Sequence, residues 1–262
     1  MYVEVNGYKT FYSNGTGNIA TDQPSVIFLH GAAMDHSVWV LPSRYFARHG
    51  YNVFALDLPN HGRSLGESPV SIDGFADWLK DAMDALNIDS AAIVGHSLGS
   101  LIALNFAARY PGKTRVLALL GTSTPMPVTD QLLDAARENH HDAIDMANTW
   151  SHSNFGQMGG SENPGVCMTM SGQRLLEMAN NGAFFTDLNA CNEFANGDEL
   201  AKHVTAPTLV IIGEQDKMTA PISAQAVADG IADSRVVRLN PCGHSMLAEQ
   251  PNAVLDALAT IV

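Results

Sequence analysis

The chain has 262 residues, of which 46% are hydrophobic and 16% are charged. It is long enough for one large domain, and its composition is that of a globular protein, which excludes a disordered, collagen-like or coiled-coil chain. Its 14 basic and 27 acidic residues give a formal net charge of −13. This charge repels phosphate backbones and anionic lipids, so we expect neither nucleic acid nor a membrane as a partner.

The start of the chain and its cysteines predict where the protein works. The first ten residues, MYVEVNGYKT, contain neither a basic region nor an apolar core of the kind found in secretory signals. We therefore expect a cytoplasmic protein. Cys167, Cys191 and Cys242 stand at unrelated spacings, which indicates neither a disulfide framework nor a zinc site. The oligomeric state is not encoded in any of these features.

In chain order, the pattern is that of alternating strands and helices. Residues 2–12 alternate around Asn6-Gly7, which predicts a β-hairpin. Strand-like apolar runs follow at 26–29, 53–56, 91–94, 116–120, 209–212 and 236–239. Amphipathic helical segments are expected at 75–86, 98–109, 222–231 and 253–261. This alternation predicts an α/β fold, a mostly parallel sheet with helices on both faces.

The alternation stops between residues 120 and 208. Residues 125–203, here called the helical insert, show several short helical patterns and no convincing strand. The insert holds eleven acidic against three basic residues, and six of the 11 methionines. We therefore expect two parts: a core made of residues 1–124 and 204–262, and a helical cap made of residues 125–203.

The strongest chemical motif is Gly95-His96-Ser97-Leu98-Gly99, which fits G-x-S-x-G. It follows an apolar strand and precedes a helix. On such a strand–turn–helix the serine Oγ is exposed on a strained turn, and the flanking glycines let the strand and helix approach closely. Ser97 is therefore the candidate nucleophile.

A serine hydroxyl needs a base and a carboxylate that orients the base. His244 follows the last expected strand, in a loop that ends at the same sheet edge as Ser97. Asp216 lies in the loop after the preceding strand, and Glu214 in that loop is a rival acid. We prefer Asp216 because it lies further from the strand end.

A tetrahedral intermediate also needs backbone N–H donors for its oxyanion. One is expected from Leu98, directly after the nucleophile. The second is expected from the His30-Gly31-Ala32-Ala33 turn after the strand at 26–29. We predict that Ala32 supplies it, with Ala33 as the alternative.

Together these motifs make the chain resemble the α/β-hydrolase-fold serine hydrolases, of the capped, carboxylesterase-like kind. The resemblance covers nearly the whole chain, including Asp57-Leu-Pro-Asn-His-Gly-Arg-Ser64 after the second expected core strand. It implies a mostly parallel sheet of about eight strands, with the helical cap inserted after the sixth. It implies hydrolysis of carboxylic esters through an acyl-enzyme, without a cofactor or a metal ion.

Two residues depart from the common pattern of these hydrolases. Asn60 and Ser100 stand where relatives commonly have glycine. Alternatives of the same fold remain open: an enol-lactone hydrolase, a carbon–carbon bond hydrolase or a perhydrolase. The serine at the elbow argues against epoxide opening and halide displacement, for which relatives use aspartate. A protein that binds a ligand without turnover is the alternative that is not an enzyme.

Four aromatic side chains of the insert are the candidate lining of a pocket for a small ester substrate: Trp150, Phe155, Phe184 and Phe185.

Two other motifs are rejected on context. Residues 15–20 fit G-x-G-x-x-A but precede a strand, which predicts a loop and no dinucleotide site. The adjacent histidines His140 and His141 point to different helix faces, as on a solvated surface.

Overall fold

The computed structural model describes residues 1–16, 18–163 and 165–262. Gly17, in the loop expected at 15–20, and Pro164, in the helical insert, lie outside the described residues. Among the described residues, no helix combines the length and the apolar character needed to cross a bilayer.

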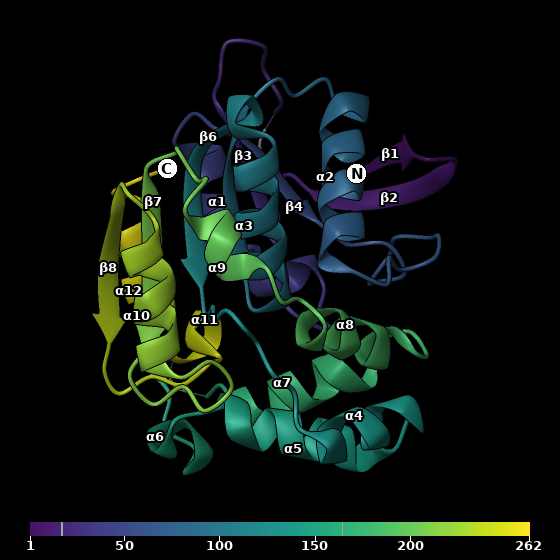
Figure 1. Ribbon diagram of the computed structural model, residues 1–262, viewed down its shortest axis with the longest axis vertical. Coiled ribbons are helices and arrows are strands. Elements are labelled where there is room, and N and C mark those ends of the chain that lie inside the picture. The colour runs from purple at the N-terminus through teal and green to yellow at the C-terminus, as the bar shows by residue number, and fades with distance from the viewer. Residues whose placement is uncertain (17, 164) are drawn as a thin grey trace.

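The centre of the molecule is an eight-stranded sheet with the order β1-β2-β4-β3-β5-β6-β7-β8 (Figure 1). The strands are β1 (Tyr2–Val5), β2 (Tyr8–Ser13), β3 (Ser25–Leu29), β4 (Asn52–Leu56), β5 (Ala91–His96), β6 (Thr114–Leu120), β7 (Thr208–Gly213) and β8 (Ser234–Leu239). The β1–β2 and β2–β4 pairs are antiparallel, and the remaining pairs are parallel. The predicted fold class is confirmed, and so is each predicted strand.

The amino-terminal hairpin forms for the reason that its sequence suggests. Asn6 and Gly7 have φ angles of 52° and 83°, the positive values that a tight two-residue turn requires. The turn brings Val5 opposite Tyr8. β2 then pairs with β4 and joins the hairpin to the parallel sheet.

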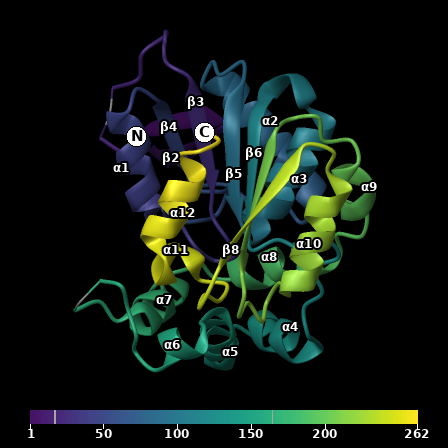
Figure 2. The ribbon, with the colours of Figure 1, turned by 90° about the vertical axis from the view of Figure 1, so that its left-hand side faces the viewer.

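Helices cover both faces of the sheet (Figure 2). Residues of α2 (Ile72–Ala85), α3 (Leu98–Arg109) and α10 (Pro221–Gly230) belong to one buried cluster. The other cluster includes residues of α1 (Val40–Arg48), α11 (Met246–Glu249) and α12 (Pro251–Leu258). Successive strand residues point to opposite faces: Ile27 packs in the first cluster and Phe28 in the second.

Helix α1 is the main element that was not predicted from the sequence. Pro42 lies inside it and is ordinarily a helix breaker. Proline is tolerated in the first turn, where backbone N–H groups have no acceptor within the helix. Pro42 occupies the third position of α1, so it costs no helical hydrogen bond.

The insert follows β6 and contains helices without a strand among its described residues. These helices are α4 (Asp130–Arg137), α5 (His141–Ser151), α6 (Asn154–Gln157), α7 (Met168–Glu177), α8 (Ala183–Asn192) and α9 (Gly197–Ala201). Helices α4 to α8 lie beyond one end of the sheet (Figures 1 and 2). The last helix, α9, contributes Ala201 to the core cluster that also contains α3 and α10.

Candidate active site

Ser97 stands on a sharp turn between β5 and α3. Its backbone has φ 55° and ψ −121°, a combination that is strained for a residue with a side chain. The turn is held by the Ser97 N–H, which donates to the carbonyl oxygen of Leu120 on β6 at 2.9 Å. The strain presents the hydroxyl at the carboxyl end of the sheet, where ligands bind in open α/β sheets.

The two glycines of the motif allow strand, turn and helix to pack closely. A Cβ on Gly95 would lie 2.0 Å from the carbonyl oxygen of Gly99, and a Cβ on Gly99 would lie 2.3 Å from the carbonyl oxygen of Leu29. Both distances are impossible for a real methyl group. The spacing of the motif is therefore a steric requirement at this position.

His244 and Asp216 form a buried hydrogen-bonded pair. His244 Nδ1 lies 2.8 Å from Asp216 Oδ2, and both side chains are nearly inaccessible to solvent. The carboxylate accepts the Nδ1 proton, which leaves Nε2 as the free basic nitrogen. The backbone of His244 is also fixed, because His96 Nε2 donates to its carbonyl oxygen at 2.9 Å.

Asp216 is held in place by four donors. Its Oδ1 accepts the N–H groups of Met218 and Thr219, each at 2.8 Å. Its Oδ2 accepts the Thr219 hydroxyl at 2.7 Å in addition to His244. Burial alone would raise the pKa of Asp216, but attraction to His244 and these hydrogen bonds lower it below its ordinary value. The rival acid Glu214 forms an ion pair with Arg238 at 2.8 Å instead.

The candidate oxyanion donors lie on the elbow and on the neighbouring loop. Leu98 is the first residue of α3, where backbone N–H groups lack an acceptor within the helix. On the other loop, a Cβ on Gly31 would lie 3.2 Å from Ser97 Cβ, so this backbone runs beside the serine. The N–H of the alternative donor, Ala33, is engaged by Asp187 Oδ2 at 2.9 Å. Ala32 therefore remains the candidate on this loop.

A small cavity of about 90 Å³ lies between the sheet and the insert. Ser97, His244 and Ala32 line it on the core side, and Trp150 and Cys191 are among the residues that line it on the insert side. The structure thus brings the candidate nucleophile, base and oxyanion loop to one cavity.

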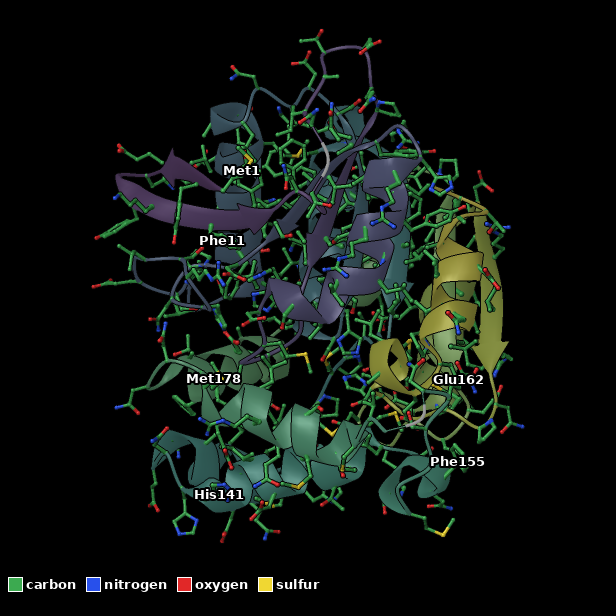
Figure 3. The ribbon with its side chains drawn as sticks, turned by 180° about the vertical axis from the view of Figure 1, so that it is seen from behind. Met1, Phe11, His141, Phe155, Glu162 and Met178 are labelled. Atoms are coloured by element: carbon green, nitrogen blue, oxygen red, sulfur yellow. The ribbon has the colours of Figure 1, made fainter. Side chains whose placement is uncertain are left out.

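Of the four predicted aromatic residues, only Trp150 is among the described residues that line this cavity. Phe155 is 48% exposed on the outside of the insert (Figure 3). Phe184 lines a separate surface cavity within the insert. Phe185 packs within the insert, with the Arg137 guanidinium 4.7 Å from its ring centre. None of these three is among the described residues that line the cavity at Ser97, and their contact with a substrate stays a prediction.

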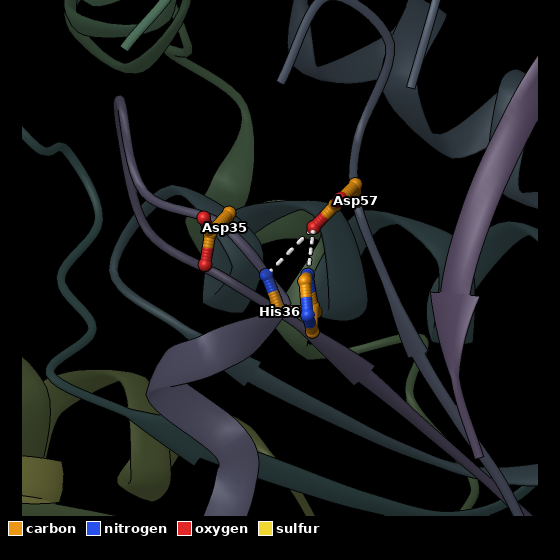
Figure 4. A group of neighbouring side chains, drawn as sticks. All are labelled: Asp35, His36 and Asp57. Atoms are coloured by element: carbon orange, nitrogen blue, oxygen red, sulfur yellow. Dashed lines mark hydrogen bonds and ion pairs between the residues drawn. The ribbon is translucent and has the colours of Figure 1, made fainter. Parts of the chain in front are cut away.

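One cluster has the residue types of a metal site. Asp35, His36 and Asp57 could hold an ion together (Figure 4). However, Asp57 Oδ1 already accepts the N–H and the Nδ1 of His36, each at 2.7 Å, and its Oδ2 accepts the Arg63 N–H at 2.8 Å. None of the three is among the described residues that line the cavity at Ser97. Asp57 serves to join two loops that follow neighbouring strands.

Some residues of the site were not predicted. Gly121 has φ 57°, and a Cβ there would lie 2.9 Å from the His244 ring. Thr219 joins Asp216 through both its backbone and its hydroxyl. The sequence offered only weak signals for these roles, a glycine directly after β6 and a threonine three residues after the acid. Leu188 and Cys191, which also line the cavity, gave no signal.

The family model described as alpha/beta hydrolase fold matches residues 24–148. A hydrolase of Acinetobacter baylyi, named (E)-2-((N-methylformamido)methylene)succinate hydrolase, is 27% identical over 219 residues, 77% of this chain and 78% of the relative. The pimeloyl-[acyl-carrier protein] methyl ester esterase of Aromatoleum aromaticum is 26% identical over 243 residues, 88% of this chain and 94% of the relative.

The fold likeness extends over almost the whole chain. The crystal structure of the enol-lactonase from Burkholderia xenovorans LB400 superposes with a TM-score of 0.87 at 22% identity. The superposition covers 99% of this chain and 98% of the enol-lactonase. The eight-stranded sheet and the helices that follow its sixth strand are therefore parts of a fold seen in solved structures.

Proposed function

We propose that this chain, which has the α/β-hydrolase fold, is a serine hydrolase that cleaves carboxylic esters through an acyl-enzyme. The observation that carries the proposal is the buried His244–Asp216 hydrogen bond of 2.8 Å, next to the cavity that His244 shares with Ser97. Esterase activity is also named for one of the relatives.

In the proposed reaction, Ser97 Oγ attacks the ester carbonyl carbon while His244 Nε2 takes the hydroxyl proton. Asp216 keeps the other imidazole proton on Nδ1 and stabilises the imidazolium that forms. The Ala32 and Leu98 N–H groups stabilise the negative oxygen of the tetrahedral intermediate. The imidazolium then gives its proton to the leaving alcohol. Water, activated by the same histidine, hydrolyses the acyl-enzyme.

The size of the cavity suggests the substrate class. About 90 Å³ is room for only a few water-sized groups, and Met126, Leu132 and Trp150 make much of the lining apolar. We propose that this cavity holds a short uncharged acyl group. The acidic insert disfavours anionic substrates.

A second, larger space is a candidate for the remainder of the substrate. A groove of about 790 Å³ reaches His96 and Ser245, the sequence neighbours of Ser97 and His244. Met34 from the core and Met168 from α7 are among its lining residues, and methionine side chains adapt to irregular apolar shapes. We propose that the groove takes a larger apolar leaving group.

The test compares the wild-type protein with Ser97→Ala on p-nitrophenyl acetate, butyrate and octanoate. We expect hydrolysis of the short esters that disappears in Ser97→Ala and persists in Ser90→Ala, a change at an exposed serine. Enol-lactones and vinylogous diketones in the same panel separate the related hydrolase chemistries. Serine-independent hydrolysis, or a clear preference for one of those other substrates, would contradict the ester proposal.

A further inference from the structure

A buried carboxylate of the helical insert contacts the loop that carries Ala32. Asp187, on α8, is fully buried, and its Oδ2 accepts the Ala33 N–H at 2.9 Å and His61 Nε2 at 2.7 Å. We propose that Asp187 is a positioning residue, which fixes the Ala32–Ala33 backbone and thereby aims the oxyanion donor. This inference rests on the proposed function, because it gives Asp187 a task in that reaction.

The backbone at this point needs an external restraint. Ala33 has φ 56°, in the left-handed region, which is unfavourable for a residue with a Cβ. The Ala33 N–H bond to Asp187 holds the peptide that follows Ala32. Only the two backbone dihedrals of Ala32 separate this peptide from the N–H that would bind the oxyanion. Fixing one N–H therefore restricts the direction of the other.

The contacts of His61 indicate that the pair is charged. His61 Nε2 faces the Asp187 carboxylate and Nδ1 lies 2.8 Å from the carbonyl oxygen of Pro59. The carbonyl oxygen of Pro59 and the ionised carboxylate of Asp187 can only accept, so with Asp187 ionised both ring nitrogens carry a proton. Burial lowers the pKa of His61, but attraction and hydrogen bonding to Asp187 outweigh it, and the pKa lies above its ordinary value. An ionised donor strengthens the bond to the carboxylate.

The neighbouring histidine stays neutral. The His30 ring lies 5.0 Å from the His61 ring, measured between centres. Its Nδ1 donates to the Gly31 carbonyl oxygen at 2.8 Å, and its Nε2 accepts the Leu58 N–H at 3.1 Å. Burial and the nearby His61 lower the pKa of His30 to about 4. A neutral His30 thus holds the Gly31 carbonyl of this loop, while a charged His61 holds Asp187.

This arrangement couples the insert to the catalytic loop. Asp187 comes from α8, whereas Ala33 and His61 come from loops of the core. Leu188 and Cys191, on the same helix, line the cavity at Ser97. The oxyanion loop is therefore fully fixed only when α8 is seated on the core.

The experiment measures kcat and KM of Asp187→Asn and Asp187→Ala on p-nitrophenyl acetate. Asparagine keeps the shape and an acceptor for the Ala33 N–H but does not balance the His61 charge. We expect kcat to fall about 10- to 100-fold in Asp187→Ala, up to the loss that a misplacement of about 1 Å can cause, with a smaller fall in Asp187→Asn. KM should change less than about threefold in both.

The matched control is Asp145→Asn. Asp145 pairs with His141 at 3.2 Å, but both side chains are more than half exposed, and His141 lies on the outer side of the insert (Figure 3). We expect kinetics equal to wild type. Unchanged kcat in a folded Asp187 variant, or a rise in KM alone, would overturn the proposal.

A second measurement uses the wild-type protein and does not depend on a variant that folds. The Ala33 amide should exchange its hydrogen slowly in amide hydrogen exchange, because a buried carboxylate accepts it. Rapid exchange would overturn the proposal. Absence of Ser97-dependent hydrolysis in the wild type would contradict the proposed function instead, and slow Ala33 exchange would still be expected.

Discussion

Replacing Asp216 with asparagine should reverse the proton position on His244. Asp216 Oδ1 accepts two backbone N–H groups, from Met218 and Thr219, so the amide oxygen of asparagine must occupy this site. The amide NH₂ then takes the place of Oδ2, 2.8 Å from His244 Nδ1. It donates to Nδ1 and forces the imidazole proton onto Nε2. Such a histidine does not accept the proton of Ser97.

The expected loss follows from this change of tautomer. The same exchange in a serine protease triad lowers kcat about 10⁴-fold, which corresponds to about 5.5 kcal/mol of barrier. The side-chain shape and both Oδ1 hydrogen bonds are retained, so we expect the Asp216→Asn variant to fold. The loss should therefore be in kcat and not in the amount of folded protein.

The assay is steady-state hydrolysis of p-nitrophenyl acetate, with circular dichroism to confirm folding. Glu214→Gln is the control, because Glu214 lies in the same loop but pairs with Arg238 on the partly exposed side of β8. We expect wild-type kcat within about twofold for this control, since exposed ion pairs contribute little. A loss of kcat of less than tenfold in Asp216→Asn, or a loss of more than about twofold in Glu214→Gln, would refute the reasoning.

Three further predictions concern the packing, the cavity and a buried histidine. Gly99→Ala should leave little folded protein, because the new Cβ would lie 2.3 Å from the Leu29 carbonyl oxygen. The control is Gly112→Ala, where nothing lies within 4 Å of the new Cβ, and this variant should express and melt like the wild type. Trp150→Ala should enlarge the cavity and raise kcat/KM for the octanoate relative to the acetate ester, and an unchanged ratio would exclude Trp150 from the acyl site. His96 is buried, and burial and the nearby His244 lower its pKa to about 3. The unfolded chain binds this proton below about pH 6.5 and the folded protein does not. The free energy of unfolding in urea should therefore fall as pH decreases from 6.5 towards 4, and a constant value would contradict the burial of a neutral ring.

The fold and part of the site were predictable because they depend on short stretches of sequence. Ser97 is defined by a strand, two glycines and a helix within a dozen residues. Asp216 and His244 follow neighbouring parallel strands, and the carboxyl ends of such strands meet at one edge. The placement of all three could therefore be predicted without knowledge of side-chain packing.

The remainder depends on long-range packing. Phe155 and Trp150 lie five positions apart in the insert, yet one is exposed and the other lines the cavity, because the orientation of short helices is set by their neighbours. Asp187 and His61 are separated by 126 positions. Asp187 has no local pattern to distinguish it from the ten other acidic residues of the insert. Only the folded chain shows that it is buried and paired.

The most direct test of the proposed serine hydrolase is the site of covalent labelling by a fluorophosphonate, mapped by mass spectrometry of proteolytic peptides. We predict one phosphonyl adduct, on the peptide that contains Ser97. The adduct should be absent from Ser97→Ala and should form much more slowly in His244→Ala. An unlabelled wild-type protein, or an adduct on another residue, would contradict the assignment of Ser97 as the nucleophile.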